Sequence, residues 1–179
     1  MIASGVIKEI AMKAYYDTHI ADFRIRTALE QDTGLILQFI KELAEYEQLL
    51  NEVVATEEIL RESLFIKKQA KVILAEYKGE PVGFALFFHN FSTFLGTANV
   101  YLEDLFIRES HRGLGLGQAM FACLAKITLE SGGGRLDWWC LDWNEPSIAF
   151  YKRMGAKAMD EWTVYRVDGE ALSDLARRL

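Results

Sequence analysis

The sequence lacks any stretch that approaches the roughly 18 consecutive apolar residues of a membrane-spanning helix. Its first 11 residues carry one lysine and no strong apolar block, so we expect no secretory signal. Hydrophobic residues make up 51% of the 179 positions and charged residues 26%. That mix is typical of a globular protein with a substantial core, and we expect no association with a membrane.

Cysteine is scarce, and only Cys123 and Cys140 occur in the chain. Cys123 falls on the apolar face of a predicted helix, and Cys140 falls in a strand-like run. Two thiols in a chain of this size do not make a disulfide framework, so we expect both to be buried and reduced. We therefore expect a cytoplasmic protein.

Positive charge is also in short supply. Lysine and arginine total 20 residues against 26 aspartates and glutamates, which leaves a net charge of −6. This balance gives no electrostatic reason to expect a nucleic acid as the partner. It favours a cationic small molecule instead.

Several catalytic and nucleotide-binding motifs are missing. The three histidines, His19, His89 and His111, form no pair at metal-binding spacing, so we expect no metal. The chain has neither a Walker A loop nor the Gly-x-Ser-x-Gly turn of hydrolases. A dinucleotide-binding fingerprint would need glycine where Gln118 or Met120 stands, and too little sequence follows for the remaining strands.

Apolar periodicity and turn signals predict alternating strands and helices. We expect strands over residues 23–27, 71–77, 82–91, 98–107, 135–141 and 163–167, and helices over 30–46, 56–65, 114–130, 147–154 and 169–179. Hairpin-linked strands precede a strand–helix–strand unit, which predicts an α/β (α+β) fold with a mixed sheet and helices on both faces. We expect one domain over residues 23–179, preceded by an extension over residues 1–22 whose role stays open.

The most informative segment is the glycine-rich run RGLGLG at residues 112–117, between a predicted strand and a predicted helix. Alternating glycines let several backbone N–H groups converge on one point with no Cβ in the way. The positive end of the helix dipole adds attraction for an anion. The run therefore predicts a phosphate-binding turn, although a purely structural turn could have the same composition.

Three further segments accompany this run: YLEDLF at residues 101–106, WNEPSIAFYKR at 143–153 and KELAEYE at 41–47. Together with Arg112-x-x-Gly115-x-Gly117 they resemble the GNAT superfamily of N-acetyltransferases, and within it the diamine (spermidine/spermine) and thialysine acetyltransferases. The resemblance covers about residues 23 to 175. It implies a twisted, mostly antiparallel sheet whose two parallel central strands, 98–107 and 135–141, splay apart around acetyl-CoA.

The resemblance also implies which residues hold acetyl-CoA. Backbone groups of Leu105, Phe106 and Ile107 would pair with the pantetheine, and Asn144 and Ser147 would contact the cofactor elsewhere. The pyrophosphate would lie on the loop formed by Arg112, Gly113, Leu114, Gly115, Leu116, Gly117 and Gln118. Backbone N–H groups bind a pyrophosphate through charge-assisted hydrogen bonds and need no metal ion.

For the chemistry, the resemblance implies direct attack of a neutral amine on the thioester, with no acyl-enzyme. Tyr151 matches the residue that protonates the leaving thiolate, and Glu103 matches the residue that relays the proton of the amine. A carboxylate in a buried strand costs free energy unless it has a partner, which favours a functional Glu103. Whether Glu103 is the base or only binds the ammonium stays open.

On the acceptor side, the expected substrate-binding residues are Tyr46, Glu47, Glu103, Asp142 and Trp162. A solvated helix face is the alternative interpretation of the acidic run that contains Glu42, Glu45, Glu47, Glu52, Glu57 and Glu58. We expect a polyamine or diamine as acceptor; the alternative acceptors are a lysine-like amino acid such as thialysine, or a protein amine. A non-catalytic acyl-CoA-binding module is the alternative to an enzyme. The resemblance also implies a homodimer with contacts from the C-terminal strand and helix.

Overall fold

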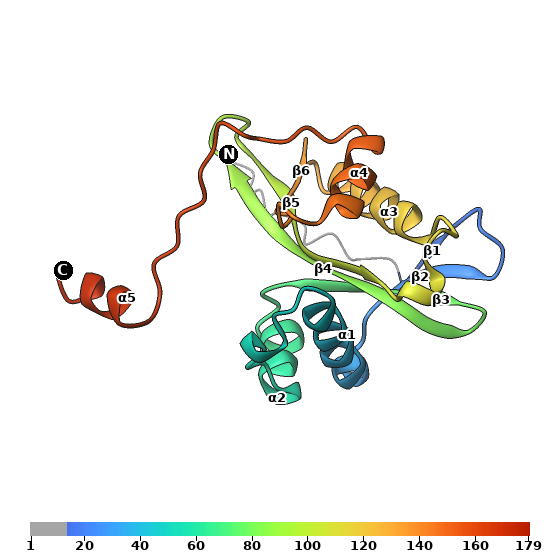
Figure 1. The fold of residues 1–179 in the computed structure, drawn as a ribbon, viewed down its shortest axis with the longest axis horizontal. Coiled ribbons are helices and arrows are strands. Elements are labelled where there is room, and N and C mark those ends of the chain that lie inside the picture. Colours follow the sequence, from blue (N-terminus) through green and yellow to red (C-terminus); the bar gives the residue numbers. More distant parts are fainter. Residues whose placement is uncertain (1–13) are drawn as a thin grey trace, which may run out of the picture. The chain divides into compact units, whose positions relative to one another are not determined.

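The computed structural model describes residues 14–179, which form two compact units, one ending at Trp139 and one running from Cys140 to Leu179. The first unit contains a six-stranded sheet whose strands lie in chain order, from β1 to β6 (Figure 1). All neighbouring strands are antiparallel except β5 and β6, which are parallel. The predicted mixed sheet is confirmed.

The strands are β1 (Tyr15–Asp17), β2 (Phe23–Thr27), β3 (Lys71–Tyr77), β4 (Glu80–Ser92), β5 (Thr97–Ile107) and β6 (Leu136–Trp138). The α-helices are α1 (Thr33–Tyr46), α2 (Glu57–Arg61), α3 (Leu116–Glu130), α4 (Glu145–Arg153) and α5 (Gly169–Ala176). Shorter turns of helix are η1 (Glu30–Asp32), η2 (Leu50–Glu52), the π-helical η3 (Glu62–Ile66) and η4 (Glu109–His111).

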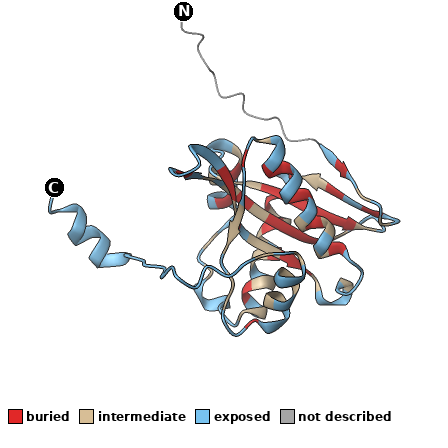
Figure 2. Ribbon diagram, turned by 90° about the horizontal axis from the view of Figure 1, so that it is seen from above, coloured by how far each residue is buried: buried red, intermediate tan, exposed pale blue. Residues whose placement is uncertain are grey.

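Helices cover both faces of the sheet, as predicted. On one face α3 contributes Met120 and Leu124, which are fully buried in a core that includes Ile73 of β3. On the other face Phe39 of α1 stacks on Phe84 of β4, with ring centroids 5.7 Å apart. Figure 1 shows α1 and α2 on one side of the strands and α3 on the other, and Figure 2 shows buried residues along the strands and the inner side of the helices.

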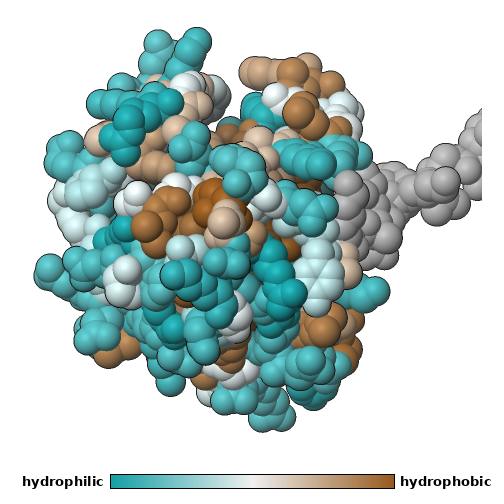
Figure 3. Space-filling view, turned by 90° about the vertical axis from the view of Figure 1, so that its right-hand side faces the viewer, coloured by the Kyte–Doolittle hydropathy of each residue, from teal (hydrophilic) through white to brown (hydrophobic). Residues whose placement is uncertain are grey.

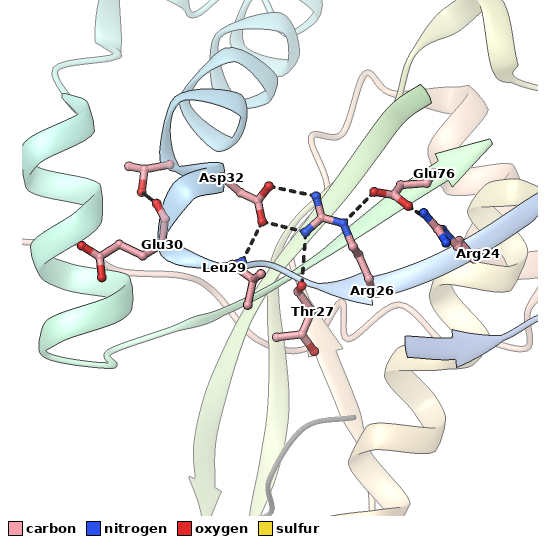
Figure 4. Close-up of polar contacts among 8 residues, drawn as sticks. Arg24, Arg26, Thr27, Leu29, Glu30, Asp32 and Glu76 are labelled. Carbon is pink, nitrogen blue, oxygen red and sulfur yellow. Dashed lines mark hydrogen bonds and ion pairs between the residues drawn. The ribbon is translucent and has the colours of Figure 1, made fainter. Parts of the chain in front are cut away.

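A buried ion-pair network joins the start of α1 to β2 and β3 (Figure 4). Arg26 donates to the two carboxylate oxygens of Asp32, at 2.6 and 2.8 Å, and to Glu76 at 2.6 Å. Arg24 also donates to Glu76, and the backbone N–H of Leu29 donates to Asp32. Burial by itself would raise the pKa of both carboxyl groups, but these hydrogen bonds hold each pKa below its usual value. The network fixes α1, whose far end carries Tyr46.

The chain differs from the predicted elements at both ends of the described part. Residues 1–13 of the predicted extension lie outside the described residues, whereas Tyr15–Asp17 form β1, which pairs with β2 and buries Tyr16. The strand predicted over residues 163–167 is wrong, because these residues are exposed and join no ladder within the described chain. Alternating apolar residues form a strand only where a neighbouring strand offers backbone partners. The single domain over residues 23–179 stays a prediction.

No helix within residues 14–179 is both long enough and apolar enough to cross a lipid bilayer. Hydrophilic residues predominate on the face drawn in Figure 3, with smaller hydrophobic areas between them. Both cysteines are free thiols. Cys123 is buried as predicted, whereas Cys140 is only half-buried because β6 ends at Trp138 instead of continuing to residue 141.

Candidate active site

A β-bulge in β5 determines how the candidate site is built. The pairing of β5 with β4 skips Glu103, because consecutive residues of β4 lie opposite Leu102 and Asp104. Leu102 and Leu105 both pack in the core on the α3 side, although residues three positions apart point to opposite faces in a regular strand. The extra residue therefore directs Glu103 and Asp104 together toward the face that α1 covers.

Three carboxylates come together on that face. Glu103 is exposed, Asp104 is half-buried, and Glu47 directly follows the last residue of α1. Burial and the charges of Glu103 and Glu47 raise the pKa of Asp104 to about 7, and burial raises the pKa of Glu47. A carboxyl group whose pKa is raised by neighbouring negative charges is stabilised in its ionised form by a bound cation, so this arrangement suits a positively charged ligand. The sequence analysis missed Asp104, although the YLEDLF segment contains it.

An aromatic group borders the carboxylates. The ring of Tyr101 packs against Phe88 at 5.1 Å and edge-on against Trp139 at 5.9 Å, measured between centroids. Burial and the charges of Glu103 and Asp137 raise the pKa of the Tyr101 hydroxyl to about 12, which places both carboxylates near this phenol. Aromatic faces beside carboxylates suit an ammonium group. Sequence reasoning missed Tyr101 and Asp137, because they become neighbours only through the register of β5 with β6.

The glycine run contacts the end of α1 through its first residue. The guanidinium of Arg112 lies over the ring of Tyr46, with its carbon 4.6 Å from the ring centroid. The Arg112 Nε also donates to the carbonyl of Ile107 at 3.1 Å. This contact brings the predicted pyrophosphate loop beside a predicted substrate-binding residue.

A second arginine ties the end of β5 to the middle of α1. Arg108 donates to both carboxylate oxygens of Glu42 at 2.8 Å and to the carbonyl of Pro81 at 2.9 Å. The hydrogen bonds from Arg108 lower the pKa of Glu42 although burial opposes them. The interpretation of the acidic run as solvated is therefore wrong for Glu42 and for the half-buried Glu47, and it is confirmed for the exposed members Glu45, Glu52, Glu57 and Glu58.

The glycine run has the form of an anion cradle. Gly113 and Gly115 adopt φ of +79° and +81°, a region that strongly favours glycine. A Cβ on Gly113 would meet no atom within 4 Å, so the loop is open on that side. Gly115 is the N-cap residue of α3 and, being glycine, has no side chain to cap the first turn of this helix. Its first N–H groups and the helix dipole therefore suit a phosphate group.

The edge of β5 beyond the bulge is also available to a ligand. The ladder between β5 and β6 covers Val100 to Leu102, and β5 continues to Ile107 without a partner on that side among the described residues. Free backbone groups on a strand edge accept an extended ligand as they would another strand. The residues present thus fit a long, phosphate-bearing cofactor that runs from the strand edge to the glycine run. The contacts of Leu105, Phe106 and Ile107 with it stay predictions.

The remaining predicted site residues belong to the second unit. The side chain of Asn144 accepts from the backbone N–H of Ser147 at 3.3 Å and thereby caps α4, which begins at Glu145, two residues before the predicted start. Tyr151 is half-buried on α4, with its ring 5.3 Å from that of Phe150. Trp162 is exposed in the segment that precedes α5, and another exposed residue of this unit is Asp142. The cofactor, catalytic and substrate roles of these residues stay predictions.

Among the described residues, no group of three or more histidine, cysteine, aspartate or glutamate side chains is arranged to hold a metal ion. The candidate site therefore consists of a backbone anion cradle, an open strand edge, and a face with carboxylates and aromatic rings. These are the parts needed to bind an anionic cofactor beside a cationic acceptor.

Comparison with known proteins identifies the family of the chain. A model of the acetyltransferase (GNAT) family matches residues 36–156. The thialysine N-epsilon-acetyltransferase of Bos taurus is 38% identical over 165 residues, which cover 85% of this chain and 96% of the relative. The L-ornithine N5-acetyltransferase of Arabidopsis thaliana is 30% identical over 195 residues, which cover 83% of this chain and 86% of the relative.

A solved structure supports the same fold. An integron cassette protein from the mobile metagenome of V. cholerae superposes with a TM-score of 0.73 at 28% sequence identity. The match covers 87% of this chain and 98% of that protein. The likeness extends beyond the sheet to nearly the whole length of that protein.

Proposed function

Because the chain belongs to the acetyltransferase (GNAT) family and is an N-acetyltransferase that acts on amines, we propose that its acceptor is a small molecule with two cationic groups. The observation that carries this proposal is the bulge that directs Glu103 and Asp104 to the same face, beside Glu47. One ammonium is the group to be acetylated, and the other compensates the remaining negative charge. Ammonium–carboxylate hydrogen bonds are roughly twice as strong as neutral ones.

Two acceptor classes fit this description. A polyamine or diamine carries only ammonium groups and suits a face with several carboxylates. An amino acid with an amine in its side chain carries an additional carboxylate, and this class is supported by the names of two relatives, which act on thialysine and ornithine. The two classes share the reacting group and differ at the other end of the molecule.

GNAT acetyltransferases use acetyl-CoA, and the open cradle at Gly113 and Gly115 fits its pyrophosphate. In the proposed complex the N–H groups at the start of α3 and the loop from Arg112 to Gln118 hold the phosphates, and the free edge of β5 holds the pantetheine. The cofactor supplies the acetyl group as an activated thioester. The protein's own contribution is to hold the amine beside that group and to move two protons.

We assign the two proton transfers to Glu103 and Tyr151. An alkyl ammonium has a pKa of about 10, so it must lose a proton before it attacks. Glu103 is exposed at the bulge and can accept that proton directly or through one water molecule. Tyr151 would donate a proton to the leaving sulfur. Each transfer contributes about 10²–10⁴-fold to the rate.

Direct attack requires no covalent intermediate on the protein. Cys123 is buried in α3, within the core on that side of the sheet, where its thiol is shielded from a substrate. Cys140 is half-buried and hydrogen-bonds to the adjacent carbonyl of Leu141. We therefore expect Cys140→Ala to retain turnover, and a trapped acetyl-cysteine would contradict direct transfer.

The function is tested by thiol release from acetyl-CoA with a panel of acceptors: spermidine, putrescine, thialysine, ornithine, lysine and a lysine-containing peptide. We expect turnover with the small amines and at most weak turnover with the peptide. Glu103→Gln should lower kcat strongly, whereas the matched control Glu45→Gln, on the exposed side of α1, should not. Turnover confined to the peptide would contradict a small-molecule acceptor.

We also propose a homodimer with contacts from residues near the C-terminus. Large apolar side chains are exposed along this segment, including Trp162, Tyr165, Leu172 and Leu175, and Figure 2 shows α5 exposed along its length. A second copy would bury this apolar surface. Light scattering should give twice the mass of one chain, and a monomer at micromolar concentration would contradict the proposal.

Two free thiols support a reducing compartment such as the cytoplasm.

A further inference from the structure

We propose that Arg135 and Asp137 bind the end of the acceptor that is not acetylated, and that this end is the head group of an α-amino acid. The inference rests on the proposed function and chooses between its two acceptor classes. It concerns residues on the strand beside the bulge that the predicted site did not include.

The two residues form a polar pair at the start of β6. The Arg135 Nε donates to Asp137 Oδ2 at 2.7 Å, and their side chains are 45% and 35% exposed. Asp137 pairs with Tyr101 across the ladder between β6 and β5. The pair is thus open to solvent. It lies beside β5, the strand that carries Glu103 and Asp104.

Asn90 of β4 holds Asp137 in place. Its side-chain nitrogen donates to Asp137 Oδ2 at 3.3 Å, across the intervening strand β5. Its side-chain oxygen is buried and receives no hydrogen bond from the described residues. The hydrogen bond from Asn90 thus orients the Asp137 carboxylate.

The separation between this pair and Glu103 matches the length of a basic amino acid. The Tyr101 phenol lies near both Glu103 and Asp137. Asp137 lies opposite Tyr101 on the neighbouring strand, so two residues along β5 and one strand across separate Glu103 from Asp137, which puts their Cα atoms about 8 Å apart. The side-chain and α-amino nitrogens are five bonds apart in ornithine and six in lysine, which is about 6–7.5 Å in an extended chain. An amine at Glu103 therefore places the α-ammonium near Asp137.

The charges of the pair complement an amino acid head group. Asp137 can accept from the α-ammonium, and the guanidinium of Arg135 can donate to the α-carboxylate, which is its preferred planar partner. The Tyr101 hydroxyl is a neutral donor beside them. A diamine would use Asp137 and leave Arg135 without a ligand, so Arg135 is the residue that separates the two classes.

The test uses acceptors that differ only by the carboxylate, namely ornithine against putrescine and lysine against cadaverine. Arg135→Met keeps an unbranched aliphatic stem and removes the charged guanidinium. We expect it to lower kcat/KM for the amino acids about 10- to 100-fold through KM, with kcat retained, as the loss of a charge-assisted hydrogen bond predicts. The diamines should change less than about two-fold. Arg135→Lys should restore part of the effect.

Two further variants complete the experiment. Asp137→Asn should weaken the binding of the amino acid and of the diamine in each comparison, because both acceptors have an ammonium at this end. Arg61→Met, on α2, is the matched control and should change neither. An equal effect of Arg135→Met on amino acids and diamines, or no effect on either, would overturn the inference. Calorimetric titration with the same pairs measures binding of the head group without any turnover. Absence of acetyl transfer would therefore contradict the proposed function but not this inference.

Discussion

The guanidinium of Arg112 stacks on the ring of Tyr46, 4.6 Å from its centroid. Arg112 begins the glycine run, and Tyr46 ends α1, so the contact links the cofactor side of the site to the acceptor side. The same arginine donates a hydrogen bond to the carbonyl of Ile107 at the end of β5. A substitution at Tyr46 should therefore alter the binding of the cofactor as well as the binding of the acceptor.

Tyr46→Leu should weaken the binding of coenzyme A. The ring fixes the side chain of Arg112, and a cation–π contact of this kind is worth about 0.5–2 kcal/mol. We expect the dissociation constant, measured by calorimetry, to rise about 2- to 30-fold. Tyr46→Phe keeps the ring and should bind nearly as the wild type does. Equal losses in both variants would show that the hydroxyl, not the stacking, is responsible.

Tyr151→Phe should lower kcat while coenzyme A still binds. The substitution removes one hydroxyl and keeps the ring beside Phe150, so α4 should keep its packing. Loss of a general acid predicts a decrease of about 10²–10⁴-fold. Rates are to be compared with an acceptor for which a single-turnover experiment shows that chemistry limits the rate. Full turnover under that condition would exclude Tyr151 as the acid.

Acceptor binding should strengthen as the pH rises through about 7, where Asp104 ionises. Below this pH Asp104 is protonated and contributes no charge for an ammonium. We expect KM for the acceptor to fall several-fold between pH 6 and pH 8, and we expect Asp104→Asn to flatten this dependence. A pH profile of KM that is the same in both proteins would contradict the assignment.

The same carboxyl group should affect stability with the opposite trend. Its folded pKa is raised above the unfolded value of 3.8, so between these values the unfolded chain releases a proton that the folded chain keeps. The contribution of this carboxyl group to the stability of the fold is complete below pH 3.8 and is lost as the pH rises toward about 7. Asp104→Asn should therefore be more stable, relative to the wild type, at pH 8 than at pH 5, as measured by urea unfolding without ligand.

Arg26→Met should destabilise the fold by about 3 kcal/mol at pH 7, because it leaves two buried carboxylates without their main partner. Asp32 and Glu76 have lowered pKa values in the fold, so their contribution is present above the unfolded values of 3.8 and 4.5 and is lost as the pH falls below them. The difference between wild type and variant should therefore shrink from pH 5 to pH 3 in urea unfolding experiments.

Arg24→Met provides the control for that network. Arg24 donates to Glu76 but is 58% exposed, and exposed ion pairs contribute at most about 1 kcal/mol. We expect a loss well below that of Arg26→Met. Equal losses would mean that burial of Arg26 does not determine the strength of the network.

Local patterns carried much of the prediction. The apolar periodicity of α1 and α3 and the glycine run before α3 each depend on neighbours within a few residues, and the structure confirms these helices. The resemblance led to Glu103 and Glu47, which the structure places on one face with Asp104. The helices and the glycine run can be read from the chain because the residues that cause them are close in sequence.

Pairing between distant segments accounts for the rest. The sequence by itself determined the helices, the glycine run and the class of sheet, because periodicity and turn residues act locally. Only the tertiary structure decided which residue of β5 forms the bulge, that Arg108 meets Glu42 across 66 positions, and that Asn90 reaches Asp137. A strand's register depends on its partner, and a shift by one residue turns every side chain to the opposite face.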